Sequence, residues 1–430
     1  MQAQRGIKLS SQFPFNSRRS NAILQLMKTQ FSWMLLVLAC GILYAGCAGK
    51  APVPSWVSKI STVKTPIGPE EILKLPQGDP ITFAKLSDDL DMTRVIYVGE
   101  SHDQIEHHQI QVRIIEALLA KGKEIAIGME MFERSQQPIL DRWSQGLLTE
   151  EEFLEKIQWE TTWGMDYELY KGILDLARTH HLKVLGLNVP RDLVRKVGEN
   201  GTMKLSSEDK KRLPEMDLTD RQHRAYIVSI YKGHGKSSVK DFEKFYEAQC
   251  LWDEGMAESL FEFLKSPQAE GKTLLVLAGS GHVVFNFGIP KRLDRRIAVP
   301  SKTIVLRAWT GKLDTDLTFT EASFPLADFL WITKPNPPEK KKPRIGVILK
   351  QEQEDQKGLW IEKVLPGSPA EKAGLLPGDQ LISVEGKDVT RVKDIHKVLE
   401  QKGWGKTIIF TILREGTKKE ITVTLPPSED

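Results

Sequence analysis

The chain has 430 residues, of which 40% are apolar and 27% charged, which is the composition of an ordinary globular protein. Its 60 basic and 57 acidic residues leave a net charge of +3, so no basic surface suggests a nucleic-acid partner. The length favours two domains. Two of the three cysteines, Cys40 and Cys47, lie in an apolar N-terminal segment, so the chain has no disulfide framework.

Residues 1–47 are predicted to be an N-terminal extension followed by a targeting signal. From Met27, the sequence MKTQFSWMLLVLACGILYAGCAGK combines one Lys, an apolar stretch and small residues before a Cys, and it resembles a bacterial lipobox. We therefore expect Met27 to be the true start and Cys47 to be lipidated. The protein would then be a lipoprotein of the bacterial cell envelope that faces the periplasm or the exterior. Residues 31–47 are near the lower length for a membrane span, so an uncleaved signal anchor is the alternative.

Residues 48–80 are Pro-rich and weakly patterned, and they are predicted to be a tether. From Arg94 onward, short apolar segments alternate with amphipathic helical patterns. The apolar segments are RVIYVG, EIAIGMEMF, LKVLGLNVP and TLLVLAGSGH. Near-continuous Val/Ile/Leu runs of this kind are typical of buried parallel strands. The alternation predicts an α/β domain over residues 81–333, with a largely parallel sheet flanked by helices.

Residues 334–343, KPNPPEKKKP, join prolines to a run of lysines and are predicted to be a linker. Beyond them, residues 344–427 contain five segments that alternate like strands and one helical pattern, RVKDIHKVLEQKG. This pattern predicts a small β-rich domain. It contains no cluster of catalytic residues.

Within that domain, VLPGSPAEKAGLLPGDQLISVEGKDV resembles a PDZ domain of the bacterial secreted type. The resemblance implies that the C-terminus of a protein or peptide adds as a strand beside RIGVIL, with its carboxylate held by nearby backbone amides. A helix would form the opposite wall of the groove. The peptide-binding residues that this implies are Ile345, Gly346, Val347, Ile395, Val398 and Leu399. A trypsin-like protease is disfavoured, because no GNSGG-like loop is present and AGSGH lacks the G-x-S-x-G spacing of an esterase elbow.

Polar residues follow each predicted strand of the first domain. The residues concerned are Glu100, His102, Glu130, Asn188, Arg191, Ser280 and His282. In open α/β sheets, ligands bind beyond the carboxyl ends of the strands. If the strands are parallel neighbours, Glu100, His102, Glu130 and His282 meet at one rim.

Several of these residues have a purely structural alternative. Glu100 and Asp103 could cap the helix that follows them. His107 and His108 are expected to be structural or surface residues in the first turns of that helix. Glu130 would be buried and therefore needs a partner.

The motifs YVGESHD, IGMEMFER, LGLNVPR, GSGHV and LADFLWIT resemble the ChaN-type haem-binding uptake lipoproteins, which belong with the Tiki and erythromycin-esterase-like proteins in a wider superfamily. The resemblance covers about residues 80–333. It implies a mixed α/β fold, lipidation, and haem bound through a tyrosinate in a homodimer; a phenolate oxygen suits ferric iron. The motifs do not select the ligand. The candidate tyrosines are Tyr167, Tyr170, Tyr226 and Tyr231, with Tyr246 as a further candidate and Tyr97, inside a predicted strand, as the weakest.

The same resemblance supports a second class of function, because Glu100, His102, Glu130 and His282 match positions where hydrolase relatives keep catalytic or metal-binding residues. Two imidazoles and a carboxylate would hold a divalent metal with an open water site. Without a metal, a His beside a carboxylate would act as a general base. The leading hypothesis is an envelope lipoprotein that binds haem or a related iron cofactor and recruits a partner through its PDZ domain. An esterase- or peptidase-like hydrolase is the alternative, and a scaffold with a vestigial site is a third possibility.

Overall fold

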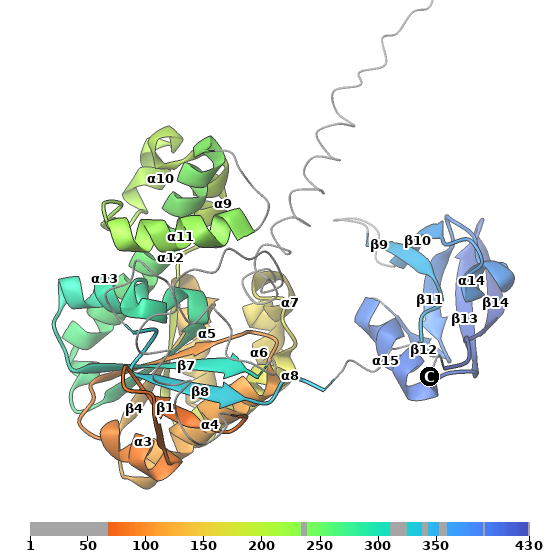
Figure 1. Ribbon diagram of the computed structural model, residues 1–430. Helices are drawn as coiled ribbons and strands as arrows, with labels where there is room; N and C mark the ends of the chain where they lie inside the picture. Colours follow the sequence, from red (N-terminus) through yellow and green to blue (C-terminus); the bar gives the residue numbers. More distant parts are fainter. Residues whose placement is uncertain are drawn as a thin grey trace, which may run out of the picture. The chain divides into compact units, whose positions relative to one another are not determined.

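The computed structural model describes residues 68–233, 239–309, 325–337, 343–351, 359–389 and 392–428. The predicted targeting segment, including Cys47, lies outside these ranges. Within them, no helix is both long and apolar enough to cross a membrane. The chain divides between Asn336 and Pro337 into two compact units (Figure 1).

The first unit is built on an eight-stranded sheet in the order β2-β1-β8-β7-β3-β6-β4-β5. Its parallel strands are β8 (Phe329–Thr333), β7 (Ser301–Ala308), β3 (Val95–Glu100), β6 (Thr273–Gly279), β4 (Ile125–Glu133) and β5 (Lys183–Asn188). At one edge, β1 (Ile72–Lys74) and β2 (Asp79–Ile81) are added antiparallel. The predicted α/β fold with a largely parallel sheet is confirmed.

The sheet is covered on both faces, which explains why its central strands are apolar at nearly every position. Val95 and Tyr97 of β3 point into one core, and Ile96 and Val98 point into the other. The first core is closed by α11 (Arg221–Gly233), α12 (Val239–Lys265) and α13 (Ile289–Arg296). The second is closed by α3 (Phe83–Asp89), α4 (Ile105–Ala120), α5 (Gln137–Ser144), α6 (Glu150–Ile157), α7 (Trp159–Thr162) and α8 (Tyr167–Thr179).

A smaller cluster of helices packs beside α12. It contains α9 (Arg191–Asn200) and α10 (Ser207–Lys211) (Figure 1). Helix α9 contributes Leu193, Val194 and Val197 to an apolar cluster shared with α12. The remaining short turns of the unit are η1 (Arg134–Gln136), η2 (Thr202–Lys204), η3 (Pro267–Ala269), η4 (Ser280–His282) and η5 (Val284–Asn286).

The predicted boundaries of the first domain differ from the structure at both ends. The prediction that residues 48–80 are a tether is wrong for its last part, because Ile72 pairs with Trp331 in the sheet and the Glu70 amide donates to Ile332 O at 2.7 Å. At the other end, Asn336 lies within the predicted linker but remains attached to the unit. Its side-chain oxygen accepts from the Ile105 amide at 3.0 Å.

The second unit is a six-stranded antiparallel sheet in the order β14-β13-β11-β10-β9, with β12 paired to β11. The strands are β9 (Val347–Gln351), β10 (Leu359–Val364), β11 (Gln380–Val384), β12 (Lys387–Asp388), β13 (Thr407–Arg414) and β14 (Thr417–Thr424). Two helices, α14 (Pro369–Lys372) and α15 (Val392–Lys402), complete it. The fold agrees with the small β-rich domain predicted for this part of the chain.

Candidate functional site

The candidate site lies where three neighbouring parallel strands end. In the sheet, β6 lies between β3 and β4, and Glu100, the last residue of β3, pairs with Gly279, the last residue of β6. Glu130 lies in the last part of β4, and η4 carries His282 directly after β6. The topology therefore brings together residues that are far apart in the sequence, as expected at the carboxyl edge of such a sheet.

Glu100 is 2% exposed and acts as an acceptor for several side chains. Its Oε1 atom lies 2.9 Å from His102 Nδ1 and accepts from the Tyr170 hydroxyl at 3.1 Å. Its Oε2 atom accepts from the Gln111 amide and lies 3.4 Å from His108 Nδ1. Burial alone would raise the pKa of Glu100, but the charge of His108 and the hydrogen bond from His102 outweigh burial and lower this pKa to about 2.

His102 uses its two ring nitrogens on different neighbours. Nδ1 is taken by Glu100, whereas Nε2 points towards Gly279 and Glu130. A Cβ atom on Gly279 would lie 3.0 Å from His102 Nε2 and 3.5 Å from Glu130 Oε2, so only glycine leaves this approach open. Burial lowers the pKa of His102, but the hydrogen bond to Glu100 and the charge of Glu130 reverse this and raise it above its ordinary value.

Glu130 connects the first histidine to the second. Its Oε2 atom accepts from the Gly279 amide at 2.7 Å, and its Oε1 atom lies 3.4 Å from His282 Nε2. On the far side of the ring, His282 Nδ1 lies 2.6 Å from Asp253 Oδ1. Burial alone would lower the pKa of His282, but the charges of Glu130 and Asp253 raise it well above its ordinary value.

The site is therefore an alternating series of carboxylates and imidazoles. We call these five residues the acid–base chain: Glu100, His102, Glu130, His282 and Asp253. Each imidazole has one carboxylate at Nδ1; Nε2 of His282 lies 3.4 Å from Glu130, and Nε2 of His102 lies beside Gly279, where the charge of Glu130 acts on the ring. A carboxylate at Nδ1 fixes the ring orientation and tautomer and makes the other nitrogen more basic. The arrangement is suited to holding and moving protons.

Asp253 was not predicted from the sequence. It lies in the middle of α12 and is fully buried, as is its neighbour Glu254. The available signal was a pair of acidic residues inside an apolar helical stretch, LWDEGMAESL. Buried carboxylates of this kind need partners.

The residues around the first histidine have structural roles. His107 is fully buried; its Nδ1 atom accepts from the Ser101 amide at 2.9 Å and its Nε2 atom lies 3.1 Å from Thr333 Oγ1. The alternative in which Glu100 and Asp103 cap the following helix is wrong. That helix begins after Gln104 without any side-chain cap, because Glu100 is engaged by the imidazoles.

Three other strand-end residues lie outside the acid–base chain. Asn188 orders its own turn, since its side chain accepts from the Val189 amide at 2.9 Å and donates to Glu130 O at 3.1 Å. Arg191 donates to the carbonyl of Thr161. Ser280 is 8% exposed, and its hydroxyl has no hydrogen-bond partner in the part of the chain that the structure describes.

The candidate tyrosines fall into two groups. Tyr170 is disfavoured as a ligand, because its side chain is fully buried, its hydroxyl donates to Glu100, and burial and that carboxylate raise its pKa well above its ordinary value. Tyr167, on the same helix, is 8% exposed, and burial together with the charge of Glu150 raises its pKa. Tyr226 and Tyr231 lie on α11 in contact with aromatic rings; they are 8% and 5% exposed, and burial raises the pKa of Tyr231. Burial therefore does not distinguish these tyrosines from Tyr167.

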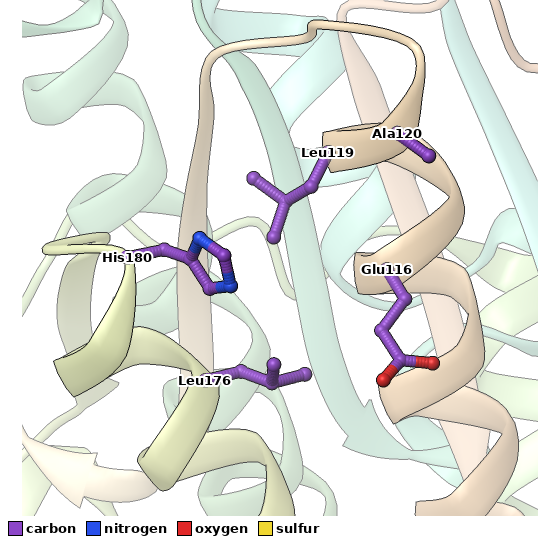
Figure 2. Close-up of a pocket in the computed structure, with 5 residues that line it drawn as sticks. All are labelled: Glu116, Leu119, Ala120, Leu176 and His180. Atoms are coloured by element: carbon purple, nitrogen blue, oxygen red, sulfur yellow. The ribbon is translucent and has the colours of Figure 1, made fainter.

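The described ranges contain no group of three or more His, Cys, Asp or Glu side chains arranged to hold a metal ion. The alternative in which the acid–base residues ligate a divalent metal therefore has no support from their arrangement. An open hollow of about 420 Å³ lies elsewhere, between the C-terminal ends of α4 and α8 (Figure 2). It is lined by Glu116, Leu119, Ala120, Leu176 and His180, none of which belongs to the acid–base chain.

In the second unit, the residues predicted to bind a peptide divide into core and backbone contributors. Ile345, Ile395 and Leu399 have buried side chains that belong to the apolar core, and Val398 is 9% exposed. These side chains form the base beneath β9 and α15 rather than an open wall. The loop before β9 is fixed by two backbone bonds: the Ala370 amide donates to Ile345 O and the Leu365 amide to Gly346 O, both at 2.9 Å.

Comparison with known proteins places both units. Residues 86–293 match the family described as haem-binding uptake, Tiki superfamily, ChaN, and residues 343–425 match the PDZ domain family. A solved structure of cofacial haem binding to ChaN of Campylobacter jejuni is 21% identical, covers 60% of this chain and 95% of its own, and has a TM-score of 0.48. The serine endoprotease of Yersinia pestis is 27% identical over 20% of this chain and 29% of its own, with a TM-score of 0.18.

Curated relatives match over short stretches. The serine protease HTRA1 of Xenopus tropicalis is 36% identical over 76 residues, which are 18% of this chain and 16% of that protein. The magnetosome formation protease MamE of Paramagnetospirillum magneticum is 31% identical over 72 residues, which are 17% of this chain and 10% of that protein. The chain thus spans a small fraction of the length of these relatives. Its two units each match one family: residues 86–293 form a domain of the haem-binding uptake, Tiki superfamily, ChaN type, and residues 343–425 form a PDZ domain.

Proposed function

We propose that the protein is a lipid-anchored protein of the bacterial cell envelope whose first domain binds haem and whose PDZ domain captures the C-terminus of a partner protein. The family match carries the haem half of this proposal. The edge strand and the loop before it carry the PDZ half. The lipobox-like sequence ending at Cys47 motivates the lipid anchor, and mass spectrometry of the mature protein tests it through an acylated Cys47.

Two of the candidate tyrosines lie on α11, Tyr226 and Tyr231. Tyr231 lies in an aromatic cluster, with ring centroids 5.4 Å from Phe242 and 5.3 Å from Phe245. Tyr226 lies 5.5 Å from Phe285 in the same way. These rings belong to the buried core of the unit, so the support for haem at this helix is the tyrosine itself, because a phenolate oxygen suits ferric iron. When bound, haem would supply a ferric centre. Tyr226 or Tyr231 would hold the iron through its phenolate oxygen after losing the hydroxyl proton.

Hemin titration tests this assignment. The purified protein is expected to give a saturable Soret shift, and Tyr226→Phe or Tyr231→Phe is expected to abolish it. Tyr97→Phe is the matched control, because Tyr97 is buried inside β3 and its loss should leave the shift unchanged. A wild-type protein without a saturable shift would refute haem binding, and size-exclusion chromatography with and without hemin reports whether two copies share it.

The loop before β9 is arranged to hold a carboxylate. In a trans peptide the C=O and the next N–H point in opposite directions. Because the carbonyls of Ile345 and Gly346 are engaged by Ala370 and Leu365, the amides of Gly346 and Val347 point away from those anchors. Among the described strands of its sheet, β9 lies at one edge and β14 at the other, and the free edge of β9, next to this loop, offers a ladder to an added strand.

This half of the proposal is tested with paired peptides that end in a free carboxylate or an amide. Isothermal titration is expected to show binding of the free-acid peptides only, because the two amides have no anion to hold in the amidated form. Equal affinity for both forms would show that the loop does not recognise a C-terminal carboxylate.

A second function is favoured by one observation, the acid–base chain, because a protein that only frames haem has no use for two imidazoles that are each oriented by a carboxylate. We propose that His102 and His282 act there as acid and base in hydrolysis of an ester or peptide. The test is turnover of activated ester and peptide substrates by the wild type, His102→Gln and His282→Gln. Turnover that survives both substitutions would refute the assignment.

A further inference from the structure

His282 is held in one protonation pattern by its neighbour on α12. The Nδ1 atom lies 2.6 Å from Asp253 Oδ1, closer than the Gln249 side-chain nitrogen at 3.2 Å. An ionised carboxylate only accepts hydrogen bonds, so the Nδ1 atom of His282 carries a proton. This leaves Nε2 as the atom that faces Glu130, at 3.4 Å.

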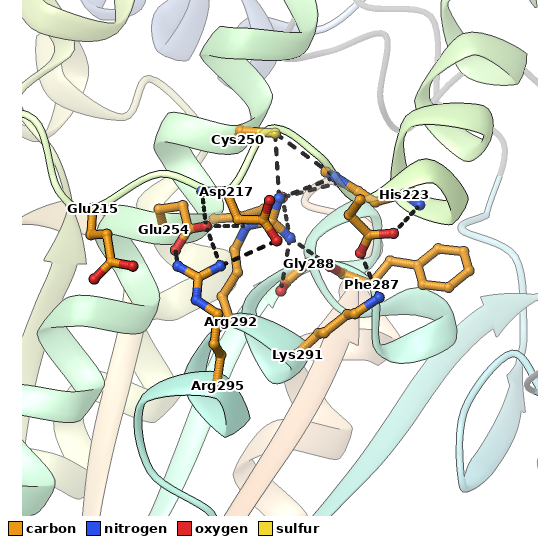
Figure 3. A network of polar contacts seen from close by, with 12 residues as sticks. Glu215, Asp217, His223, Cys250, Glu254, Phe287, Gly288, Lys291, Arg292 and Arg295 are labelled. Carbon is orange, nitrogen blue, oxygen red and sulfur yellow. Dashed lines mark hydrogen bonds and ion pairs between the residues drawn. The ribbon is translucent and has the colours of Figure 1, made fainter.

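Asp253 also faces a second buried histidine. Its Oδ2 atom lies 3.4 Å from His223 Nε2, both side chains are completely buried, and neither of these two atoms has a hydrogen-bond partner in the described part of the chain. His223 Nδ1 lies 3.1 Å from Arg292 Nη2 (Figure 3). A guanidinium only donates, so His223 Nδ1 must accept and its proton must be on Nε2, pointing at Asp253.

Arg292 cannot easily turn away, because it is fixed on several sides. Its Nη1 atom donates to Phe287 O at 2.6 Å, and its Nη2 atom also lies 3.3 Å from Cys250 Sγ. Its Nε atom lies 3.4 Å from Glu254. Glu254 also forms ion pairs with two other arginines of α13, Arg295 (Figure 3) and Arg296. The Arg292 side chain is 3% exposed. A rigid donor at this point fixes the tautomer of His223.

The backbone is shaped to allow this contact. A Cβ atom on Gly288 would lie 2.1 Å from His282 O and 3.0 Å from Asp253 Oδ1. Only glycine therefore lets the turn that carries His282 approach Asp253 closely.

We propose that Asp253 is the positioning residue of His282, and that Arg292 and His223 in turn fix the direction in which Asp253 presents its two oxygens. The inference rests on the proposed acid–base function of His282. Asp253 does not touch a substrate in this scheme. It keeps the Nδ1–H tautomer, so that the Nε2 atom of His282 is directed to the rim.

The test reads the ring protons by NMR of the imidazole nitrogens in the full chain labelled at histidine, without any substrate, over a pH series that reaches the neutral His282 ring, because the pKa of His282 is raised well above its ordinary value. The His282 and His223 signals are assigned by their loss in His282→Gln and His223→Phe. An Asn at position 253 presents one acceptor and one donor instead of two acceptors. Because Arg292 forces His223 to keep its Nε2 proton, Asp253→Asn is expected to remove the Nδ1 proton of His282 and to leave the His223 signal in place.

Asp209→Asn is the control, since Asp209 is also a buried carboxylate, at 8% exposed, but pairs with Lys196 and Ser206; the His282 signals of this variant should be those of the wild type. A His282 Nδ1–H signal that persists in Asp253→Asn would overturn the proposal. Should that variant fail to fold, His223→Phe is decisive: faster exchange of the His282 Nδ1 proton supports the relay, and an unchanged signal refutes it. A protein that shows the expected tautomers but hydrolyses nothing refutes the acid–base function alone.

Discussion

Replacing Glu100 with Gln is expected to lower the free energy of unfolding of the first unit by about 3 kcal/mol at pH 7. The magnitude follows from the pKa of the carboxyl group, which falls from an ordinary 4.5 to about 2. Each unit of such a shift corresponds to about 1.36 kcal/mol of differential interaction, which gives a sum of about 3 kcal/mol.

The physical cause is the loss of a carboxylate whose two oxygens face four side chains. His102 and Tyr170 need the Oε1 atom, while Gln111 donates to Oε2. The new amide offers one oxygen, and its nitrogen must face at least one of these donors. Buried donors left without an acceptor cost the desolvation free energy of each group.

The stability difference also depends on pH in a defined direction. A carboxyl group with a depressed pKa stabilises the folded state above its unfolded pKa, and this contribution is lost as the pH falls through the folded value. The wild type should therefore lose the contribution of Glu100 between about pH 4.5 and pH 2, whereas Glu100→Gln has none to lose. The difference between the two proteins should shrink over that interval.

Urea unfolding of the full chain, followed by near-UV circular dichroism at several pH values, measures both effects. Glu124→Gln is the control, because Glu124 forms only an exposed ion pair with Lys272 and its loss should change stability by less than about 0.5 kcal/mol. A loss below about 1 kcal/mol in Glu100→Gln, or a pH-independent difference, would show that Glu100 is not held as an ionised acceptor.

The remaining predictions concern single side chains in both units. Gly346→Ala should weaken peptide binding in isothermal titration and lower the melting temperature of the PDZ unit, because Gly346 has φ +81° and a Cβ would lie 2.4 Å from that of Ser368; wild-type affinity would refute the loop assignment. Arg414→Met should cost the PDZ unit about 3 kcal/mol in urea unfolding, because Asp379, 1% exposed, loses its ion-pair partner; a change near zero would contradict this. Gly279→Ala should shift the imidazole NMR signals of His102, because its Cβ would lie 3.0 Å from His102 Nε2; unchanged signals would show that the site accommodates a methyl group.

Much of the fold was predictable because its physical signals are local. The central strands are apolar at nearly every position, as strands covered on both faces must be, and each ends in polar residues. The parallel topology then sufficed to predict that Glu100, Glu130 and His282 lie at one edge. No side-chain distance was needed.

The parts that sequence reasoning missed depend on non-local contacts. Residues 72–74 form a strand of only three residues, too short for a periodic pattern, and their partner strand lies more than 250 positions away. Tyr170 was a reasonable ligand candidate until the structure placed its hydroxyl on Glu100. Asp253 is one of many acidic residues on a long helix, and only the packing of α12 against η4 shows that it faces a histidine.

The position of β6 between β3 and β4 has a consequence for how the protein is made. Residues 134–272 separate β4 from β6, so at a synthesis rate of about 5–20 residues per second the strand that completes the centre of the sheet follows about 7–30 s after its two neighbours. During that interval β3 and β4 have no partner between them, and their open apolar edges could pair with other chains. The three-strand edge that carries Glu100, Glu130 and His282 is therefore complete only once residue 279 has emerged.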